Sequence, residues 1–383
     1  MRRLLVLACS IVFLDVAFYT AIVPLLPTYV DDLGLGRTGA GLLSASYAAG
    51  NLVAAIPAGL LAARVGSRAC AIGGLVLLGT ASCAFGFAGQ VALLDGARFL
   101  QGVGGSMAWA GAFTWVITGT PAEKRGQMIG TTLAVAVVGA LLGPPLGALA
   151  IAVGTQAVFG SVLLVALLLA VAAARTPETA EPRREGLGTV VSAAADRNVL
   201  LGVAMVAVPS TVFGAEGVLV PLRIDELGGS ALAIAAGFTA AAGVESVVAP
   251  FVGRYSDRAG RVAPYLAGLL VSAASLIALG LGALPLVLAA TVVLGAGAGL
   301  LFTPATAALA DAADATGMHQ GIAAGLTNVA WAGGQVVGGL GGGAGASALG
   351  DAAPFLFISA LLLVVAAGMR RFGAAALPAE AAD

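Results

Sequence analysis

The residue best suited to chemistry is Asp15, which interrupts an otherwise almost wholly apolar run from Leu4 to Leu26. At about 1.5 Å of rise per residue, its carboxyl group lies near the middle of a hydrocarbon layer about 30 Å thick. A charge there costs at least about 2.5–3.5 kcal/mol, so the side chain must face protein or water. Burial disfavours the charged form of a carboxyl group. We therefore predict a proton-coupling role for Asp15; the alternative is a structural hydrogen bond between helices.

Three more ionisable residues lie inside apolar stretches, namely Arg98, Glu216 and Glu245. A buried guanidinium needs an acidic partner or several carbonyl groups. Asp95, one turn earlier, would make a structural ion pair with Arg98, whereas Glu216 lies at a similar depth from the same side. We predict Glu216 as a second proton site or as the anion that selects cationic substrates, unless it only reaches the membrane interface. Glu245 is predicted to serve either a gate or transport itself.

The composition requires a membrane around these residues. Hydrophobic residues make up 60% of the 383 residues and charged residues 10%, where a soluble domain has about 25% charged residues. The first apolar run follows Arg2 and Arg3 but is too long for a signal peptide, so we predict a retained span. A net charge of −1 offers no general attraction to nucleic acid. With one histidine and three cysteines, the chain shows no metal-binding spacing and no material for a catalytic triad.

Apolar runs separated by Gly, Pro or charged clusters predict an all-α integral membrane protein with twelve transmembrane helices. The predicted spans are roughly 4–27, 39–62, 69–88, 91–118, 127–150, 156–174, 198–222, 231–252, 262–282, 285–309, 320–345 and 352–370. The longest polar stretch divides them into six and six. The predicted units are therefore a bundle at 1–174, a cytoplasmic linker at 175–197, a second bundle at 198–371 and a short cytoplasmic tail at 372–383.

The basic residues predict the orientation, because cytoplasmic loops are rich in Lys and Arg. With both termini inside, only Arg37 and Arg223 lie outside, and Arg98 lies within a span. The inside then holds fifteen of the 18 basic residues, which are Arg2, Arg3, Arg64, Arg68, Lys124, Arg125, Arg175, Arg183, Arg184, Arg197, Arg254, Arg258, Arg261, Arg370 and Arg371. An odd number of spans would destroy this asymmetry.

Two local matches relate the halves to each other. The sequence Val-Pro-Leu at 23–25 recurs at 220–222, each time near the end of the first span of a half. The stretch 59–68 (GLLAARVGSR) resembles 253–262 (GRYSDRAGRV), each time after the second span of a half. Two parallel halves of this kind enclose a site at their interface near the midplane of the membrane.

Three motifs make the chain resemble the major facilitator superfamily, and within it the twelve-span drug/proton antiporters. The loop signature Gly-x-Leu-x-Asp-Arg-x-Gly-x-Arg is represented by Gly59, Leu61, Arg64, Gly66 and Arg68. The span-4 pattern Arg-x-x-Gln-Gly-x-Gly is represented by Arg98, Gln101, Gly102 and Gly104. The span-5 antiporter pattern is represented by Gly139, Gly143, Pro144, Pro145 and Gly147. Phe13-Leu14-Asp15 with the prolines at 24 and 27 also resembles drug and vesicular amine exchangers. The resemblance implies two pseudo-symmetric six-helix bundles with spans 1, 4, 7 and 10 around the substrate. It also implies that Arg98 takes part in proton coupling, either by relaying protons or by linking protonation to the change of shape.

The resemblance also implies a cytoplasmic gate, in which a loop carboxylate faces a helix N-terminus and nearby arginines. Ala63 stands where the first-half signature has Asp, whereas the second-half copy has Asp257. We expect Asp257 to face the start of span 5 near Arg125, so that the gate depends on one side only. The predicted gating residues are Arg64, Gly66, Arg68, Arg125, Glu245, Asp257 and Arg258.

In span 5, the two prolines remove helix donors and are expected to kink the helix. The glycines at 139, 143 and 147 form a smooth stripe for close packing. The resemblance implies a tight contact with span 8 that limits ion leak, and ordinary helix packing is the alternative. Gly334, Gly338 and Gly342 form a similar stripe in span 11.

Aromatic and amide side chains in the spans suit an amphipathic organic molecule better than a sugar, which needs more hydrogen-bonding groups. The predicted substrate-cavity residues are Tyr19, Tyr47, Asn51, Trp109, Phe113, Phe213, Phe302, Asn328 and Trp331, with Ser44, Thr303 and Gln335 as further candidates. Acids nearby favour a cationic or neutral substrate over an anion.

The prediction is a proton-coupled exporter of drugs or natural products, working by alternating access as a monomer in the cell membrane, with protons and a small molecule as partners. A metabolite uniporter or proton symporter is the first alternative, and a non-transporting sensor on the same fold is the second. Enzymatic activity, a cofactor and a bound metal are not expected, since no motif for them is present.

Overall fold

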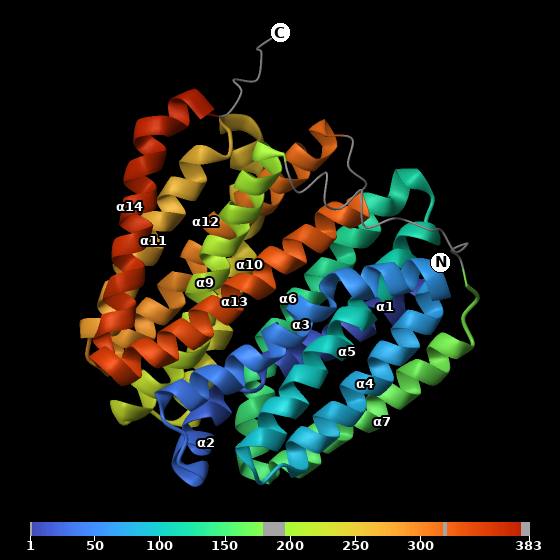
Figure 1. Ribbon diagram of the computed structural model, residues 1–383, viewed down its shortest axis with the longest axis horizontal. Helices are drawn as coiled ribbons and strands as arrows, with labels where there is room; N and C mark the ends of the chain where they lie inside the picture. Colours follow the sequence, from blue (N-terminus) through green and yellow to red (C-terminus); the bar gives the residue numbers. More distant parts are fainter. Residues whose placement is uncertain (1, 179–195, 317–319, 377–383) are drawn as a thin grey trace.

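The computed structural model describes residues 2–178, 196–316 and 320–376, and every regular element within these ranges is a helix (Figure 1). The elements are α1 (Arg2–Thr20), η1 (Val23–Leu25), α2 (Leu26–Leu33), α3 (Arg37–Val65), α4 (Ser67–Phe87), α5 (Val91–Thr118), α6 (Ala122–Val153), α7 (Thr155–Ala174), α9 (Arg197–Glu226), α10 (Ala231–Ala259), α11 (Val262–Leu281), α12 (Leu284–Ala315), α13 (Gln320–Leu349) and α14 (Ala352–Ala376).

Each of the twelve predicted spans overlaps one of these helices, except the first, which consists of α1, η1 and α2. Within the described residues, ten spans are long and apolar enough to cross a membrane. The two other long helices are α5 and α13, which at 28 and 30 residues still exceed the bilayer thickness. Both carry several glycines together with polar or amide side chains, which lowers their hydropathy.

The first span is bent because of its prolines. Pro24 and Pro27 have no backbone N–H, so the α-helical ladder gives way to the short η1 before α2 begins. The chain then turns at Gly34, whose positive φ of 62° suits glycine. The predicted single span 4–27 is therefore two helices joined by a 3₁₀ turn.

The two halves of the chain use the same helix pairings. In the first half α4 packs on α5, α3 on α5, α4 on α7 and α1 on α6. In the second half the corresponding pairs are α11 on α12, α10 on α12, α11 on α14 and α9 on α13. The repeat seen in two short sequence matches therefore extends to the packing of all twelve spans.

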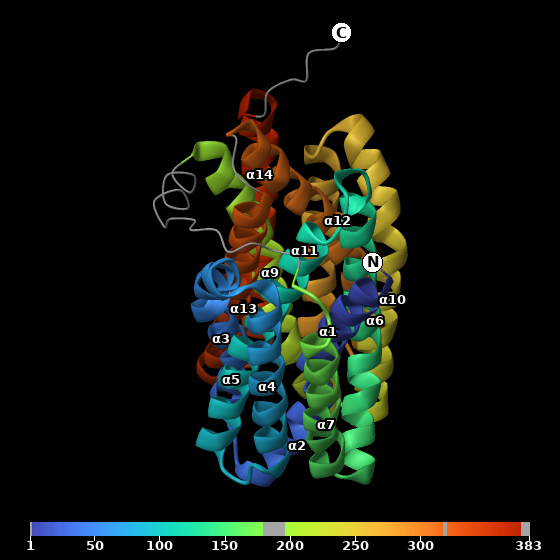
Figure 2. The same ribbon diagram turned by 90° about the vertical axis from the view of Figure 1, so that its right-hand side faces the viewer.

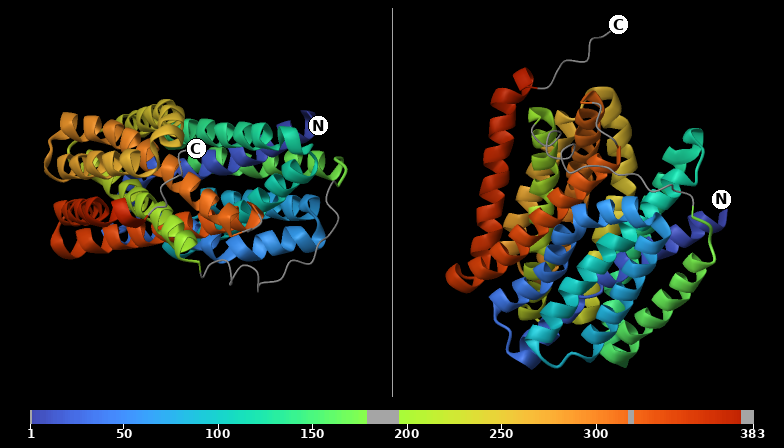
Figure 3. Two further views of the ribbon diagram at one scale, coloured as in Figure 1. Left: turned by 90° about the horizontal axis from the view of Figure 1, so that it is seen from above. Right: turned by 45° about the vertical axis from the view of Figure 1, so that its right-hand side comes forward.

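The most extensive contacts between the halves join α3 with α13 and α6 with α10, and these two pairs are equivalent under the repeat. Figure 3 shows the helices of the first half and those of the second half side by side. The buried apolar residues form two clusters, one almost wholly from residues 4–173 and one almost wholly from 199–366. The boundaries of the two predicted bundles stay a prediction.

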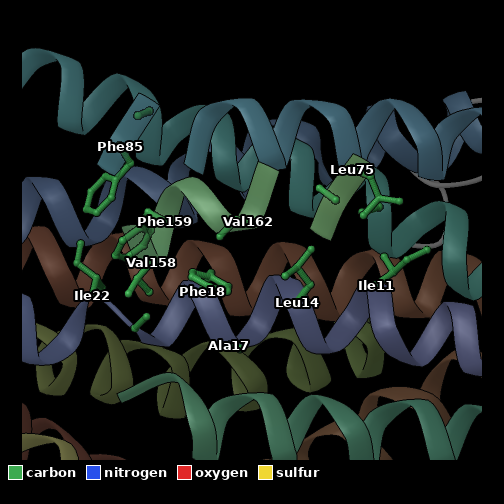
Figure 4. Packing of buried hydrophobic residues seen from close by; sticks show 14 of the residues in the cluster. Ile11, Leu14, Ala17, Phe18, Ile22, Leu75, Phe85, Val158, Phe159 and Val162 are labelled. Carbon is green, nitrogen blue, oxygen red and sulfur yellow. The ribbon is translucent and has the colours of Figure 1, made fainter. Parts of the chain in front are cut away.

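The core of the first half forms between α1, α4 and α7. Figure 4 shows Leu14 and Phe18 of α1 beside Val162 and Phe159 of α7. The rings of Phe18 and Phe159 meet edge to face with centroids 5.5 Å apart, and Phe85 of α4 lies 4.8 Å from Phe159. This apolar side of α1 leaves its other side free to carry Asp15.

We name the two ends of the molecule by what they carry. The α2 end holds α2 and the turns at Gly34, Gly154, Gly228 and Gly350 (Figure 1, bottom). The linker end holds the turns at Gly66 and Gly260 and the two segments that flank the linker, ending at 178 and beginning at 196 (Figure 2). Both glycines of the linker end have positive φ, 94° and 83°, in the two copies of the loop signature.

The glycine stripe of α6 faces α1 and not α10. A Cβ atom on Gly139 would lie 3.0 Å from the Phe13 carbonyl oxygen, and one on Gly147 only 2.0 Å from that of Ala21. The expectation that the stripe packs on span 8 is therefore wrong. The contact of α6 with α10 exists but uses Leu141, whose carbonyl oxygen accepts a hydrogen bond from Thr239 Oγ1 at 3.2 Å. The helix α6 runs through both of its prolines, and the kink at that point stays a prediction.

The stripe of α13 repeats this arrangement against α9. A Cβ atom on Gly334 would lie 2.5 Å from Ser210 Cβ, and one on Gly338 2.0 Å from the Thr211 carbonyl oxygen. Small residues allow the backbones of these pairs to approach closely. Each half is thus closed by one glycine-lined pair, α1 with α6 and α9 with α13.

Candidate functional site

Asp15 is the centre of a hydrogen-bonded cluster between α1, α3 and α5. Its side chain is 3% exposed and accepts bonds from Tyr47 Oη at 2.8 and 2.9 Å and from Trp109 Nε1 at 2.8 Å. Gly105 of α5 makes this possible, since a Cβ atom there would lie 2.4 Å from Asp15 Oδ1. Donors to both oxygens stabilise the ionised form of a carboxylate and offset part of its desolvation. Asp15 therefore faces protein and not lipid.

Arg98 is 1% exposed and is held by neutral groups. Its Nη1 donates to Gln101 Oε1 at 3.0 Å and its Nη2 to the Tyr19 carbonyl oxygen at 3.3 Å. Its Cζ lies 4.9 Å from the centre of the Tyr47 ring, where an aromatic face attracts a cation. Tyr47 thus connects the two charges, with its ring against Arg98 and its hydroxyl on Asp15.

Neither of the two partners considered for Arg98 binds it. Among the residues that the structure describes, no ion pair joins Arg98 to Asp95 or to Glu216, and Oδ1 of Asp95 is buried without a hydrogen bond. The other possibility from the sequence, carbonyl oxygens as ligands, is what the structure has. Arg98 Nε is buried without a partner, so this guanidinium has bonding capacity left over.

Glu216 of α9 lies in the other half and is 4% exposed. Its carboxylate has no hydrogen bond or ion pair within the described part of the chain. It lies within electrostatic range of Glu245 on α10, a half-buried acid, and of Tyr19 on α1. Tyr19 is also within range of Asp15 and Arg98, so the charges of the two halves meet around its ring.

The predicted aromatic residues come together in pairs. Tyr19 contacts Tyr47 with ring centroids 4.6 Å apart and Trp331 of α13 at 5.5 Å, a contact that crosses between the halves. Trp109 and Phe113 are stacked at 5.2 Å, and Phe213 and Phe302 lie at 5.3 Å.

The amide residues differ from one another. Asn51 is buried, and its Oδ1 has no partner. Gln335 is buried, and Asn328, Ser44 and Thr303 are half-buried. No hydrogen bond of Asn51 or Asn328 is seen within residues 2–178, 196–316 and 320–376.

Three residues of the cluster were not predicted as site residues from the sequence: Gln101, Ser82 and Gly105. Gln101 orients Arg98 and in turn donates from Nε2 to Ser82 Oγ at 2.9 Å. Its place in the span-4 pattern beside Arg98 could have indicated this role. Ser82 and Gly105 carry no sequence signal, since their contacts depend on how α4 and α1 lie against α5.

Five of the predicted gate residues lie at the linker end, namely Arg64, Gly66, Arg68, Asp257 and Arg258, whereas Glu245 lies in the middle of α10. Asp257 Oδ1 accepts a bond from Arg261 Nη1 at 2.6 Å, and Arg261 Nη2 also contacts Asp311 Oδ2 at 3.1 Å. The expected neighbour Arg125 has a side chain outside the described set, so that contact stays a prediction. Arg64 and Arg258 are exposed at the same end.

At the α2 end the halves are tied together by Arg37, which was not predicted as a site residue. Arg37 of α3 pairs with Glu226 at the end of α9 and with Asp351 before α14. Thr38 Oγ1 also lies 2.9 Å from Ser347 Oγ of α13. At the linker end, Arg261 bonds to Asp257 and Asp311 within the second half. The contacts of Arg37 and Thr38 between the halves hold the α2 end closed.

Replacing Arg37 by glutamine is expected to weaken this closure. Two half-exposed ion pairs contribute up to about 1 kcal/mol each, so the α2-end-open population should rise about three- to tenfold. Distances between spin labels at the α2 end would measure it. Arg223→Gln is the control, because Arg223 lies beside the same Glu226 but bridges only within α9. An unchanged distance distribution in Arg37→Gln would show that the ion pairs do not close this end.

Comparisons with known proteins agree with this geometry. The family profile described as "Major Facilitator Superfamily" matches residues 8–244 and 201–382. "MFS-type transporter ppzB" of Metarhizium majus is 33% identical over 141 residues, 35% of this chain and 31% of that protein. "Probable vesicular acetylcholine transporter-B" of Danio rerio is 33% identical over 155 residues, 38% and 31% of the two chains. "Quinolone resistance protein NorA" of Staphylococcus aureus is 27% identical over 126 residues, 33% and 32%. The aligned part thus spans about a third of these relatives.

Solved structures match over almost the whole chain and show the fold. A bacterial homolog of the human lysosomal transporter Spinster, in an inward-facing and unoccupied conformation, has a TM-score of 0.77 at 15% identity, covering 95% of each chain. A POT family transporter has a TM-score of 0.76 at 13% identity, covering 97% of this chain and 96% of the other. With the paired six-helix repeats and the family profile covering most of its length, the chain belongs to the Major Facilitator Superfamily and is a multi-pass membrane protein.

Proposed function

We propose that the protein exports amphipathic small organic molecules, cationic or neutral, in exchange for protons. The observation that carries the proposal is the pair of buried acids on opposite halves: Asp15 is held by Tyr47 and Trp109, and Glu216 has no partner among the residues that the structure describes. Ionisable groups inside a membrane protein mark ion and substrate pathways. A relative named for quinolone resistance and another named for acetylcholine support a small organic cargo.

The proposed cycle follows from what each group can do. A proton entering from the outside neutralises Asp15 or Glu216, and its release inside restores the negative charge. When Asp15 is protonated, it can accept less strongly from Tyr47 and Trp109, which weakens the contact of α1 with α3 and α5. Arg98 packs against the same Tyr47 ring, so a movement of Tyr47 also changes the contacts of Arg98. The charge on one carboxyl group is thereby coupled to how three helices pack.

The aromatic residues supply the apolar part of the site. Tyr19 with Trp331 crosses between the halves, whereas the pair Trp109 and Phe113 belongs to the first half and the pair Phe213 and Phe302 to the second. Flat apolar rings in a protein with buried acids suit a molecule with a hydrophobic body and a positive group. With the linker end in the cytoplasm, as the basic residues predict, the conformation described here faces inward, and the protein works as a monomer in the cell membrane.

Reconstitution into vesicles with an imposed pH gradient tests the proposal. A panel of lipophilic cations, neutral antibiotics and sugars is followed together with the internal pH. We expect cations or neutral antibiotics to move against the proton, and sugars not to move. Movement of substrate and proton in the same direction would establish the symporter instead, and movement unaffected by the gradient would establish a uniporter.

Glu216→Gln is expected to reduce transport of cationic substrates at least about tenfold, because a unit charge at about 4 Å contributes about 4 kcal/mol at an effective dielectric constant of about 20. Transport of neutral substrates should fall by a smaller factor. The measurement is the initial rate for one cation and one neutral compound of similar size. Asp225→Asn, on the same helix but exposed at the α2 end, is the matched control. Equal losses for both substrates would contradict a role of Glu216 in binding the cation.

A further inference from the structure

The two copies of the loop signature obtain their carboxylate in different ways. In the second half, Asp257 at the end of α10 bonds to Arg261 four residues later, and Arg261 reaches Asp311 at the end of α12. Arg261, which precedes α11, thus joins the ends of α10 and α12. At the corresponding place in the first half stands Ala63, which has no carboxyl group.

Glu178 brings a carboxylate to this place from beyond α7. Its Oε1 accepts a bond from Ser67 Oγ at 2.6 Å, and its Oε2 accepts one from the Arg68 amide at 2.8 Å. Both donors belong to the first turn of α4, where free amides and the helix dipole favour an anion. The N-cap residue of α4 is Gly66, which has no side chain to do this.

The fit around Glu178 is close. A Cβ atom on Gly66 would lie 2.7 Å from Oε2 of Glu178, and the φ of 94° at Gly66 itself excludes most other residues. Neighbouring residues hold the segment before Glu178. Trp115 Nε1, at the buried end of α5, donates to the Pro177 carbonyl oxygen at 3.0 Å, and Arg68 Nη1 contacts the Thr176 carbonyl oxygen at 3.4 Å.

We propose that Glu178 is the gate carboxylate of the first half, a positioning residue that replaces the acid missing at Ala63. It binds the start of the linker to the turn between α3 and α4, so that this turn, the end of α5 and residues 176–178 move as one body during alternating access. The inference rests on the chain being a transporter but is independent of proton coupling.

The test is a compensating pair of substitutions. Glu178→Ala is expected to leave the Arg68 amide without its acceptor, so its hydrogen exchange should accelerate at least about tenfold. The rate of downhill substrate exchange, measured without a pH gradient, should fall severalfold. Adding Ala63→Asp should restore that rate, because the repeat places residue 63 four positions before Ser67, as Asp257 stands before Arg261. Asp32→Ala removes an exposed acid at the α2 end and serves as the control.

Three results would overturn the proposal: unchanged exchange at the Arg68 amide in Glu178→Ala, an unchanged downhill rate, or a reduced rate that Ala63→Asp does not restore in a folded, monodisperse protein. Glu178→Asp, one methylene shorter, should retain part of the rate, whereas a segment that only fills space would tolerate Glu178→Leu. Because the assay uses no proton gradient, its outcome stays separate from that of the antiport experiment.

Discussion

Asp15→Asn is expected to reduce gradient-driven transport to the level of protein-free vesicles. The amide has nearly the same shape and still accepts bonds from Tyr47 and Trp109 at one oxygen, so the cluster between α1, α3 and α5 should stay folded. It cannot take up or release a proton, and a permanently neutral side chain removes the charge that Arg98 faces. The measurement is uptake against substrate concentration in vesicles with an imposed pH gradient.

Downhill exchange of substrate without a gradient separates coupling from binding in Asp15→Asn. If Asp15 couples protons, this exchange should persist while gradient-driven accumulation disappears. Asp32→Asn, an exposed acid on α2, is the matched control and should behave as the unmodified protein. Full accumulation by Asp15→Asn would assign proton coupling to other residues, with Glu216 and Glu245 the next to test.

Gly147→Ala is expected to destabilise the protein strongly for so small a substitution. The added Cβ atom would lie 2.0 Å from the Ala21 carbonyl oxygen and 2.7 Å from Pro24 Cγ, so α6 must move away from the bend in the first span. Overpacking of this kind costs about 1–3 kcal/mol or more, and we expect the melting temperature in detergent to fall by about 5 °C or more. Thermal unfolding followed by size-exclusion chromatography measures it.

Gly130→Ala on the same helix provides the comparison for Gly147→Ala. A Cβ atom at Gly130 meets nothing within 4 Å, and alanine is the better helix former. Its melting temperature should therefore stay the same or rise slightly. Equal stability of the two variants would mean that α6 and α1 do not pack as closely as described.

Much of the fold could be predicted from the sequence, because long apolar runs with few charges have one stable arrangement in a bilayer, namely spanning helices. The first span shows where this reasoning is insufficient. Pro24 and Pro27 were visible, but whether the chain would bend into a second short helix depended on the partners that α2 finds at its end of the molecule. The glycine stripe of α6 gives a second case, since its spacing predicts close packing but not which helix packs there.

The candidate site, too, could be predicted only in part from the sequence. An aspartate in the middle of a hydrophobic run must face protein or water, so burial of Asp15 follows from the energy of a charge in hydrocarbon. Its donors Tyr47 and Trp109 lie 32 and 94 residues away along the chain. They were singled out for their aromatic character, and their hydrogen bonds could not be read from spacing.

The sequence by itself determined that this chain spans a membrane with repeated halves and that a few ionisable groups are buried in it, because composition and transfer energies do not depend on the arrangement of the helices. The tertiary structure decided which groups meet. Arg98 has a carbonyl oxygen, an amide and the Tyr47 ring instead of an acid, Arg37 joins the halves at the α2 end, and Glu178 stands at the start of α4. Such contacts join residues from far along the chain, so they depend on rotations and approaches of helices that only packing fixes.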